Sequence, residues 1–317
     1  MADLVKTTSI GKKGASRPHL WKQMKRMKML YLLLLLPALN LAVFHYAPLY
    51  GVIIAFKDFK PGLGIWDSAW NQFGHFKSMY HDFVFLRALR NTLIISVSRL
   101  IVGFTFPIVF ALLINEIRAA RFKRTVQSIS YFPHFMSWVI IAGMVVEVFS
   151  PERGIVNYII TLFGGDPINF LSSKLFFIPI LLISDAWKEV GWASILYLAS
   201  ISSISPEIYE AAETDGANRF RKMFHITLPA LVPVITILFL LRLGHILSGG
   251  FDQILNMYSP LVYEVGDIID TYVFRTGLVE FRMDYSAAVG LFKNVVGITL
   301  LVTVNRIVRK YNDYGVW

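Results

Sequence analysis

The stretch YEAAETDGANRF, residues 209–220, decides how the rest of the sequence is read. It is a polar insert between two apolar segments that are each long enough to cross a membrane. Ser205 is a good N-cap and Pro206 suits the first helical position, so a helix should begin there. Asp215-Gly216 should end that helix, because glycine accepts backbone angles that other residues avoid. A second short helix is expected over about residues 218–225.

The insert also carries an ordered motif, E-A-A, two residues, D-G-A, six residues, then F-x-I-x-L-P, over residues 210–229. This motif resembles the EAA loop of ABC importer permeases, a cytoplasmic helix-turn-helix that docks into a cleft on the ATPase subunit. The alternative is a surface amphipathic turn that only joins two spans. The resemblance assigns coupling to the ATPase to Glu210, Ala211, Ala212, Asp215, Gly216, Ala217 and Phe224.

Other segments resemble the carbohydrate-uptake branch of the same family, which takes up oligosaccharides. The resemblance implies an all-α, polytopic membrane protein with the type I ABC importer permease fold, six transmembrane helices and a cytoplasmic EAA coupling helix. It also implies a second homologous permease subunit, two ATPase subunits that bind ATP and Mg, and an extracellular solute-binding protein. The segments that carry it are YGVIIAF at 50–56, LINEI at 113–117, YFPHF at 131–135 and GVW at 315–317.

The composition independently indicates a membrane protein. Hydrophobic residues make up 55% of the chain and charged residues 16%, whereas soluble domains have roughly 45–50% and about 25%. The net charge of +10 comes from basic residues around apolar runs, which is typical of topology signals and not of nucleic-acid binding. The chain has no cysteine, which excludes disulfides and thiol nucleophiles.

Membrane topology follows from the apolar runs and the basic residues. With the N-terminus inside, the inner segments carry 18 Lys and Arg and the outer loops 8, so both termini and the coupling loop at 201–228 are expected in the cytoplasm of a bacterial cell. We divide the chain into a basic N-terminal segment at 1–28, a permease domain at 29–310 and a C-terminal tail at 311–317. The six predicted spans in the bacterial inner membrane are 30–55, 91–114, 131–149, 176–199, 229–247 and 287–304.

Two outer loops are rich in aromatic residues. The loop at 57–87 suits either anchoring in the lipid headgroup layer or contact with a solute-binding protein. The loop at 251–285 is a candidate for contact with sugar or with its carrier protein, and equally for simple packing as a lid.

Ionisable residues inside spans are costly, so they mark a solute path or a structural ion pair. Two sets of polar and ionisable residues at helical spacing lie in the predicted spans on either side of the coupling loop, one in the span at 176–199 and one in the span at 229–247. An aromatic plane with polar groups around it is what a sugar ring requires, and in the family the sugar site is lined from these same two spans. The substrate-path residues that we assign are Asp185, Lys188, Glu189, Trp192, Arg242, His245 and Ser248.

Charged side chains here replace the amide-type residues that are more usual in the family. This departure leads to the hypothesis of an acidic, uronate-containing oligosaccharide, with Lys188, Arg242 and His245 offsetting its carboxylates. The alternative is a set of structural salt bridges, for example between Lys188 and Asp185. We expect Arg99 and Lys293 to lie against the partner permease.

Several motifs are absent. The sequence has no G-x4-G-K-[ST] phosphate loop, no H-E-x-x-H, no paired histidine–carboxylate metal set and no G-x-S-x-G elbow, so we expect no enzyme, no catalytic residues, no metal site and no cofactor in this chain. Two alternatives remain: a permease of the same fold for another solute, and an ion-coupled secondary transporter with Asp185 and Glu189 as ion sites.

Overall fold

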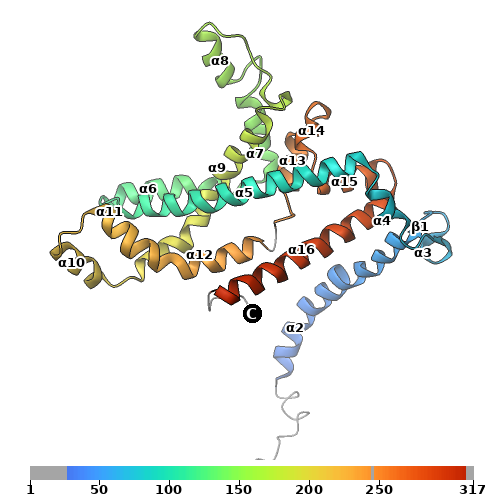
Figure 1. The fold of residues 1–317 in the computed structure, drawn as a ribbon, viewed down its shortest axis with the longest axis horizontal. Helices are drawn as coiled ribbons and strands as arrows, with labels where there is room; N and C mark the ends of the chain where they lie inside the picture. The colour runs from blue at the N-terminus through green and yellow to red at the C-terminus, as the bar shows by residue number, and fades with distance from the viewer. Residues whose placement is uncertain (1–26, 244–245, 312–317) are drawn as a thin grey trace, which may run out of the picture. The chain divides into compact units, whose positions relative to one another are not determined.

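The computed structural model describes residues 27–243 and 246–311 (Figure 1). The chain divides into two compact units, Met1–Ile53 and Ile54–Trp317. The predicted N-terminal segment at 1–28 and the tail at 311–317 therefore lie almost entirely outside the described residues, and His245 lies outside them as well.

In the first unit the described residues form one continuous helical stretch. Helix α2 (Lys28–Leu41) continues into a π-helical turn, η1 (Ala42–Tyr46), and a 3-10 helix, η2 (Ala47–Phe56), whose last residues belong to the second unit. Leucine side chains cover every side of α2 and are exposed, with Leu33 and Leu36 each at 73%. A helix that is apolar all round is suited to lipid.

The second unit begins with a small hairpin. Strand β1 (Lys57–Asp58) pairs antiparallel with β2 (Ala69–Trp70) around the short helix α3 (Gly64–Asp67), and α4 (Gly74–Met79) follows. Lys57 is buried, and its Nζ donates to the carbonyl oxygens of Ile65 at 2.7 Å, Trp66 at 2.9 Å and Ser68 at 3.1 Å. A buried ammonium needs such partners, so Lys57 fixes the loop between the two strands.

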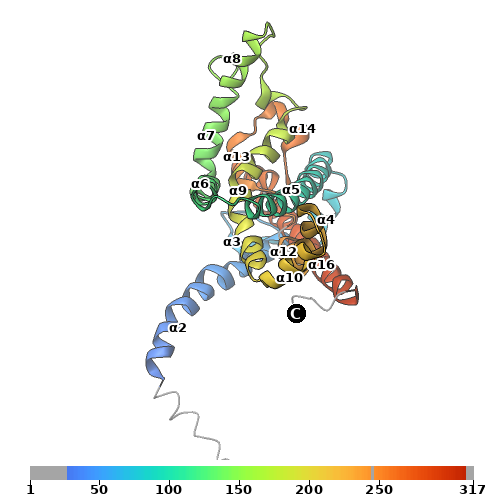
Figure 2. The ribbon, with the colours of Figure 1, turned by 90° about the vertical axis from the view of Figure 1, so that its left-hand side faces the viewer.

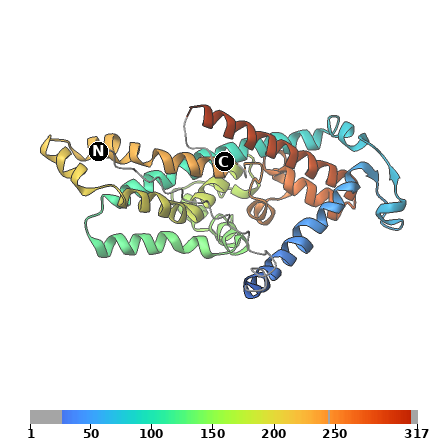
Figure 3. The same ribbon diagram turned by 90° about the horizontal axis from the view of Figure 1, so that it is seen from below.

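Long helices dominate the rest of the second unit (Figures 1 and 3). Helix α9 is central, since α5, α6 and α12 all pack against it, while α16 packs against α4, α12 and α15. The elements are α5 (Phe83–Asn115), α6 (Ala120–Tyr131), η3 (Phe132–Phe135), α7 (Trp138–Val148), α8 (Ile155–Leu162), η4 (Phe170–Ser172), α9 (Phe177–Ser202), α10 (Pro206–Thr214), α11 (Arg219–Lys222), η5 (Met223–Thr227), α12 (Leu228–Leu243), α13 (Phe251–Met257), η6 (Pro260–Val262), α14 (Tyr263–Gly266), α15 (Ile269–Phe274), η7 (Arg275–Val279) and α16 (Met283–Tyr311).

The two ends of the second unit carry different elements. Helices α10 and α11 lie at one end, and the β1–β2 hairpin with α4 lies at the opposite end (Figures 1 and 3). Helix α8 projects beyond α7, away from the α5–α9 pair (Figure 2). The predicted coupling loop and the first predicted outer loop are thus far apart within this unit.

Within residues 27–243 and 246–311, four helical stretches are long and apolar enough to cross a membrane: Lys28–Phe56, Phe83–Asn115, Arg219–Leu243 and Met283–Val308. A fifth is possible if Ala120–Phe135 and Trp138–Val148, bent by 106° at a short break, are one broken span. Helix α9 has the length of a span but carries three charged residues within five positions, which lowers its hydropathy. The count of six spans therefore stays a prediction, and its fourth member depends on how α9 accommodates those charges.

The predicted outer loop at 251–285 is mostly folded into the core. It forms α13, α14 and α15, and the side chains of Ile254, Ile268 and Ile269 are fully buried. Asp82, which caps α5, accepts hydrogen bonds from the hydroxyls of Tyr272 at 2.6 Å and Tyr285 at 2.9 Å. Burial alone would raise the pKa of Asp82, but these and two backbone hydrogen bonds outweigh it and lower that pKa. The packing alternative for this loop is the one that the structure favours.

Close packing of α6 on α9 depends on Gly191. A Cβ at this position would lie 2.1 Å from the carbonyl oxygen of Ser130 in α6, so the two helices would have to separate. We predict that Gly191→Ala lowers the free energy of unfolding by about 1–3 kcal/mol through overpacking. The measurement is the thermal unfolding midpoint of the purified, assembled transporter by tryptophan fluorescence.

Gly143→Ala is the matched control, because a Cβ on Gly143 in α7 meets nothing within 4 Å. It should unfold at the wild-type temperature or slightly above it, since alanine favours a helix. Equal midpoints for the Gly191 and Gly143 variants would contradict the packing role of Gly191.

Candidate functional site

A cavity of about 520 Å³ opens between α5, α9, α12 and residues 246–249. Four of the predicted substrate-path residues line it: Asp185, Glu189, Arg242 and Ser248. Lys188 and Trp192 do not line it, and His245 lies outside the described residues. Ser96, Arg99, Trp138 and Tyr197 complete its polar and aromatic lining, and leucine and other small apolar side chains cover the remainder.

Arg99 and Asp185 form an ion pair across the cavity wall. The Nη2 atom of Arg99 in α5 lies 3.0 Å from Oδ1 of Asp185 in α9, and both side chains are largely buried. Arg99 also donates to the amide oxygen of Gln253 in α13. The amide nitrogen of Gln253 in turn donates to the carbonyl of Leu181 at 2.9 Å and to Oγ of Ser184 at 2.8 Å. Arg99 is therefore held by its own chain, in contrast to its expected place against the partner permease.

Lys188 faces away from the cavity. Its side chain is buried, and Nζ donates to the carbonyl oxygens of His134 and Met136, each at 2.7 Å, and more weakly to that of Pro133 at 3.4 Å. These carbonyls belong to η3 and the break before α7; in a continuous helix they would have accepted hydrogen bonds from backbone amides. Lys188 does not line the cavity, and its ion-pair contact is with Glu189, whose Oε1 lies 3.9 Å from Nζ, and not with Asp185.

Glu189 and Trp192 meet the same turn from another side. The Nδ1 atom of His134 lies 3.0 Å from Oε2 of Glu189. The His134 ring stacks on Trp192 with centroids 4.6 Å apart and planes within 3°. Trp192 remains 43% exposed, and Phe135 meets it edge-on. Trp192 therefore supports the bent segment while it remains partly exposed.

Arg242 is a charged group of the cavity wall that forms no ion pair within the described residues. Among residues 27–243 and 246–311 it has no hydrogen bond and no carboxylate within 4.0 Å. Its guanidinium lies beside Gly103 of α5, where a Cβ would come within 2.0 Å of Nη1. Arg99 is paired with Asp185, and Nζ of Lys188 lies 3.9 Å from Oε1 of Glu189. Within the described residues, Arg242 is therefore the charge on the cavity wall that remains without an ion-pair partner.

The predicted coupling loop folds as two helices joined by a tight turn. Helix α10 begins at Pro206 after Ser205, whose side chain makes no capping hydrogen bond, and ends at Thr214 with Asp215 as its C-cap; Gly216 has φ of +73°. The Ala217 amide donates to the carbonyl of Ala212 at 2.8 Å, and Asn218 caps α11. The start of the first helix, the break and the start of the second helix lie where the sequence places them.

The loop's surface is exposed and partly apolar. Ile208, Phe220 and Phe224 are 50%, 71% and 55% exposed. Lys222 is bonded to Glu213, and this hydrogen bond and the lysine charge lower the pKa of that carboxyl. Large exposed apolar side chains on a polar loop are typical of a surface that binds another protein.

The second helix of the loop does not stop at about residue 225. Helix α11 passes through the π turn η5 directly into α12, so that Arg219–Leu243 is one continuous stretch. Pro229 has no N–H and would break a regular helix there. The wider turn before it absorbs the missing hydrogen bond, and any movement of α11 is therefore passed directly to α12.

Ser96 and Gln253 were not predicted as site residues, and Arg99 was assigned to the subunit interface. Ser96 and Arg99 are three residues apart in one predicted span, on the same helical face, so the spacing could have identified them. Gln253 carried no such signal, because it lies in a segment that was interpreted as an outer loop.

Comparisons with known proteins agree with this architecture. Residues 103–312 match the family described as "Binding-protein-dependent transport system inner membrane component". The chain is 44% identical over 294 residues to "Protein LplB" of Bacillus subtilis (strain 168), covering 93% of this chain and 92% of that protein. It is 40% identical over 305 residues to the "Polygalacturonan/rhamnogalacturonan transport system permease protein YteP" of the same organism, covering 96% and 95%.

Solved structures give the same result. The chain resembles a chain in the crystal structure of "a bacterial ABC transporter involved in the import of the acidic polysaccharide alginate", with a TM-score of 0.85, 42% identity and coverage of 92% of this chain and 98% of that one. For the alginate transporter in complex with an "alginate pentasaccharide-bound periplasmic protein", the TM-score is 0.86, the identity 41% and the coverage 94% and 99%. The match to the family covers most of the chain, and these relatives cover nearly all of it; the chain belongs to the binding-protein-dependent transport system inner membrane components, the permease subunits of ABC importers.

Proposed function

We propose that this chain is one of two permease subunits in an ATP-driven, binding-protein-dependent importer of uronate-containing oligosaccharides. The observation that carries the acidic specificity is Arg242, a cation that faces the cavity with no carboxylate partner among the described residues. Two relatives support it, since YteP is named for transport of polygalacturonan and rhamnogalacturonan, and the similar transporter of known structure imports the acidic polysaccharide alginate. The acidic groups of these polymers are uronate carboxylates.

The rest of the cavity suits a sugar. The Oγ atom of Ser96 and the Nε atom of Arg99 are buried and have no hydrogen-bond partner within the described residues. A buried polar atom without a partner carries a free-energy penalty of about 1–3 kcal/mol, which a hydroxyl of a passing sugar or a water would relieve. The carboxylates of Asp185 and Glu189 remain able to accept from hydroxyls, because each oxygen has two lone pairs.

Coupling to ATP hydrolysis would pass through the loop at 201–228. Two ATPase subunits would bind ATP and Mg and would contact α10 and α11 on the cytoplasmic side, where both termini would also lie. Closure of the ATPases would move α11 and with it the continuous α12, which carries Arg242 at its far end. The cavity would open outward to a solute-binding protein, in the membrane of a bacterial cell, and close again after hydrolysis.

An ion-coupled mechanism has less support. Intramembrane carboxylates that bind protons or sodium need to be free for the ion. Asp185 is occupied by Arg99 at 3.0 Å, and Glu189 is in contact with His134 at 3.0 Å.

We predict that Arg242→Gln lowers uptake of trigalacturonate about tenfold to a hundredfold, since a charged hydrogen bond contributes about 1.5–3 kcal/mol. Uptake of a neutral trisaccharide by the same assembled transporter, if it occurs at all, should change by less than about threefold. The measurement is ATP-driven accumulation of each radiolabelled sugar in proteoliposomes with the cognate binding protein.

Arg242→Lys, which keeps the charge, and Arg306→Gln, which removes an exposed arginine of α16, are the matched controls. Both should retain the preference for the acidic sugar. Equal losses for acidic and neutral sugars in Arg242→Gln would remove the charge-recognition proposal and leave the permease function standing.

The turn in the coupling loop supplies a second prediction. Gly216 has φ of +73°, and a Cβ on it would meet nothing within 4 Å, so a substitution acts on the backbone conformation alone. Gly216→Val strains this conformation, whereas Gly216→Asn tolerates it. We expect Gly216→Val to insert into the membrane but to take up at least about tenfold less sugar per ATP hydrolysed than the wild type. Gly216→Asn should keep a ratio near that of the wild type. Normal coupling in Gly216→Val would contradict the docking role of this turn.

A further inference from the structure

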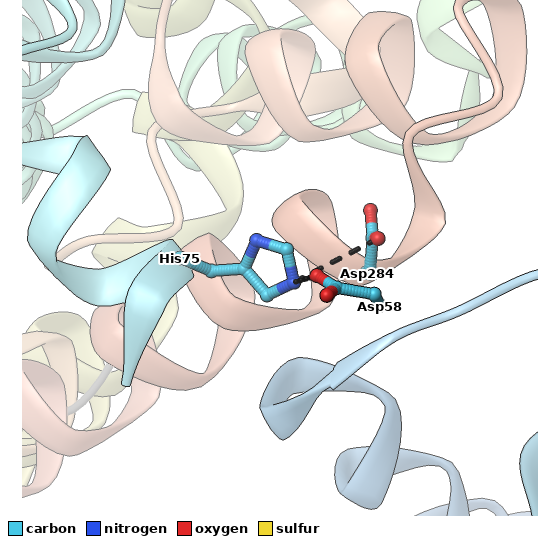
Figure 4. Close-up of side chains that lie close together, drawn as sticks. All are labelled: Asp58, His75 and Asp284. Carbon is cyan, nitrogen blue, oxygen red and sulfur yellow. Dashed lines mark ion pairs between the residues drawn. The ribbon is translucent and has the colours of Figure 1, made fainter. Parts of the chain in front are cut away.

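Three side chains that could bind a cation converge at the hairpin end of the second unit (Figure 4). Asp58 ends β1, His75 lies in α4 and Asp284 lies in the first turn of α16. The Nε2 atom of His75 is 3.7 Å from Oδ1 of Asp58 and 3.7 Å from Oδ2 of Asp284. The absence of a histidine–carboxylate set was expected from sequence spacing, which does not reveal this group because folding alone brings Asp284 to the other two residues.

The spacing fits a metal ion at the centre. Zinc is usually tetrahedral, with nitrogen and oxygen ligands at about 2.0–2.2 Å, which places neighbouring ligand atoms roughly 3.3–3.6 Å apart. The two separations of 3.7 Å require shifts of a few tenths of an ångström at most. All three donor atoms lie within 4.8 Å of one another, so one ion can contact them together.

Surrounding groups orient the donors. Asn71 donates to Oδ1 of Asp58, and the amide of Phe59 donates to Oδ2 of Asp284 at 3.3 Å. The carbonyl oxygen of Lys57 is hydrogen-bonded to Nε2 of His75 at 3.0 Å, and it would be a fourth ligand, the third through oxygen, once Nε2 binds a metal in place of a hydrogen. Hydrogen bonds of this kind to metal-binding carboxylates are typical of the second coordination sphere.

The exposed fractions of the three side chains also suit an ion that can enter and leave the site. The side chains of His75 and Asp284 are 12% and 21% exposed, whereas that of Asp58 is 55% exposed. Two donors are therefore fixed within the protein, and the third faces solvent and leaves a path by which an ion can enter. Two carboxylates and an imidazole carry a charge of −2, which a divalent cation neutralises.

We propose that Asp58, His75 and Asp284 bind a divalent transition-metal ion, with zinc the best match, that fastens the β1–β2 hairpin and α4 to the N-terminal end of α16. An imidazole donor favours zinc over calcium or magnesium, which prefer oxygen ligands alone. The ion would fix the orientation of the exposed aromatic residues Trp70 and Phe73 on the hairpin end. This site is separate from the cavity that carries the proposed function.

The test uses the whole transporter, freed of metal with EDTA and then titrated with zinc chloride without nucleotide. The zinc bound per complex is measured by mass spectrometry after gel filtration, in the wild type, His75→Gln and His81→Gln. His81 is an exposed histidine nearby and is the matched control. Because other subunits can bind zinc, the relevant quantity is the difference between variants.

We expect His75→Gln to bind one zinc fewer per copy of this chain, or to bind it at least about tenfold more weakly, and His81→Gln to match the wild type. Zinc should raise the thermal midpoint of the wild type and of His81→Gln but not that of His75→Gln. Asp58→Asn, a change at the most exposed ligand, should weaken zinc binding similarly and provides the test if His75→Gln does not assemble.

Two results would overturn the proposal. One is equal zinc content in the wild type, His75→Gln and Asp58→Asn. The other is a midpoint that rises with acidification but is indifferent to zinc and to EDTA, because the three residues would then be an ion-pair set around a protonated imidazole. Neither result bears on acidic-sugar uptake, which is measured separately.

Discussion

Charged side chains that are buried among apolar helices must find their partners inside the protein, and this constraint determines the arrangement around α9. Asp185 is offset by Arg99 at 3.0 Å, and Lys188 is bonded to carbonyl oxygens of the segment before α7. Glu189 contacts His134 and lies 3.9 Å from Nζ of Lys188. Within the described residues, Arg242 from α12 then remains on the cavity wall without an ion-pair partner, and this is why the cavity is suited to an anion.

The bend between α6 and α7 supplies hydrogen-bond acceptors for the buried ammonium of Lys188, and Lys188 supplies donors that the bend lacks. A break of 106° leaves backbone carbonyls without helical partners, and such groups are costly in an apolar environment. Lys188 satisfies two of them at 2.7 Å while losing its own hydration. The stacked pair of His134 and Trp192 holds the same turn from its other side. The cavity wall is therefore rigid where α9 meets this bend, and α12 is the wall that connects to the coupling loop.

Local signals in the sequence were sufficient for the coupling loop and insufficient for the site. Pro206 and Gly216 mark a helix start and a turn through backbone preferences that act over a few residues, and the structure agrees at both; Ser205 takes the N-cap position but makes no side-chain capping hydrogen bond. The direction of Lys188 depends on a helix break more than 50 residues earlier in the chain, which periodicity cannot reveal. Gln253 and the helices after it were interpreted as an outer loop, because their short apolar runs do not resemble spans.

The central claim is that an acidic sugar passes Arg242 while Arg99 stays paired with Asp185. The most direct measurement is a cryo-electron microscopy structure of the assembled transporter, trapped with vanadate in the presence of tetragalacturonate and the binding protein. We predict sugar density in the cavity with a carboxylate against the guanidinium of Arg242 and an intact Arg99–Asp185 pair. Sugar density away from this cavity, or Arg242 paired with a carboxylate of the second permease, would contradict it.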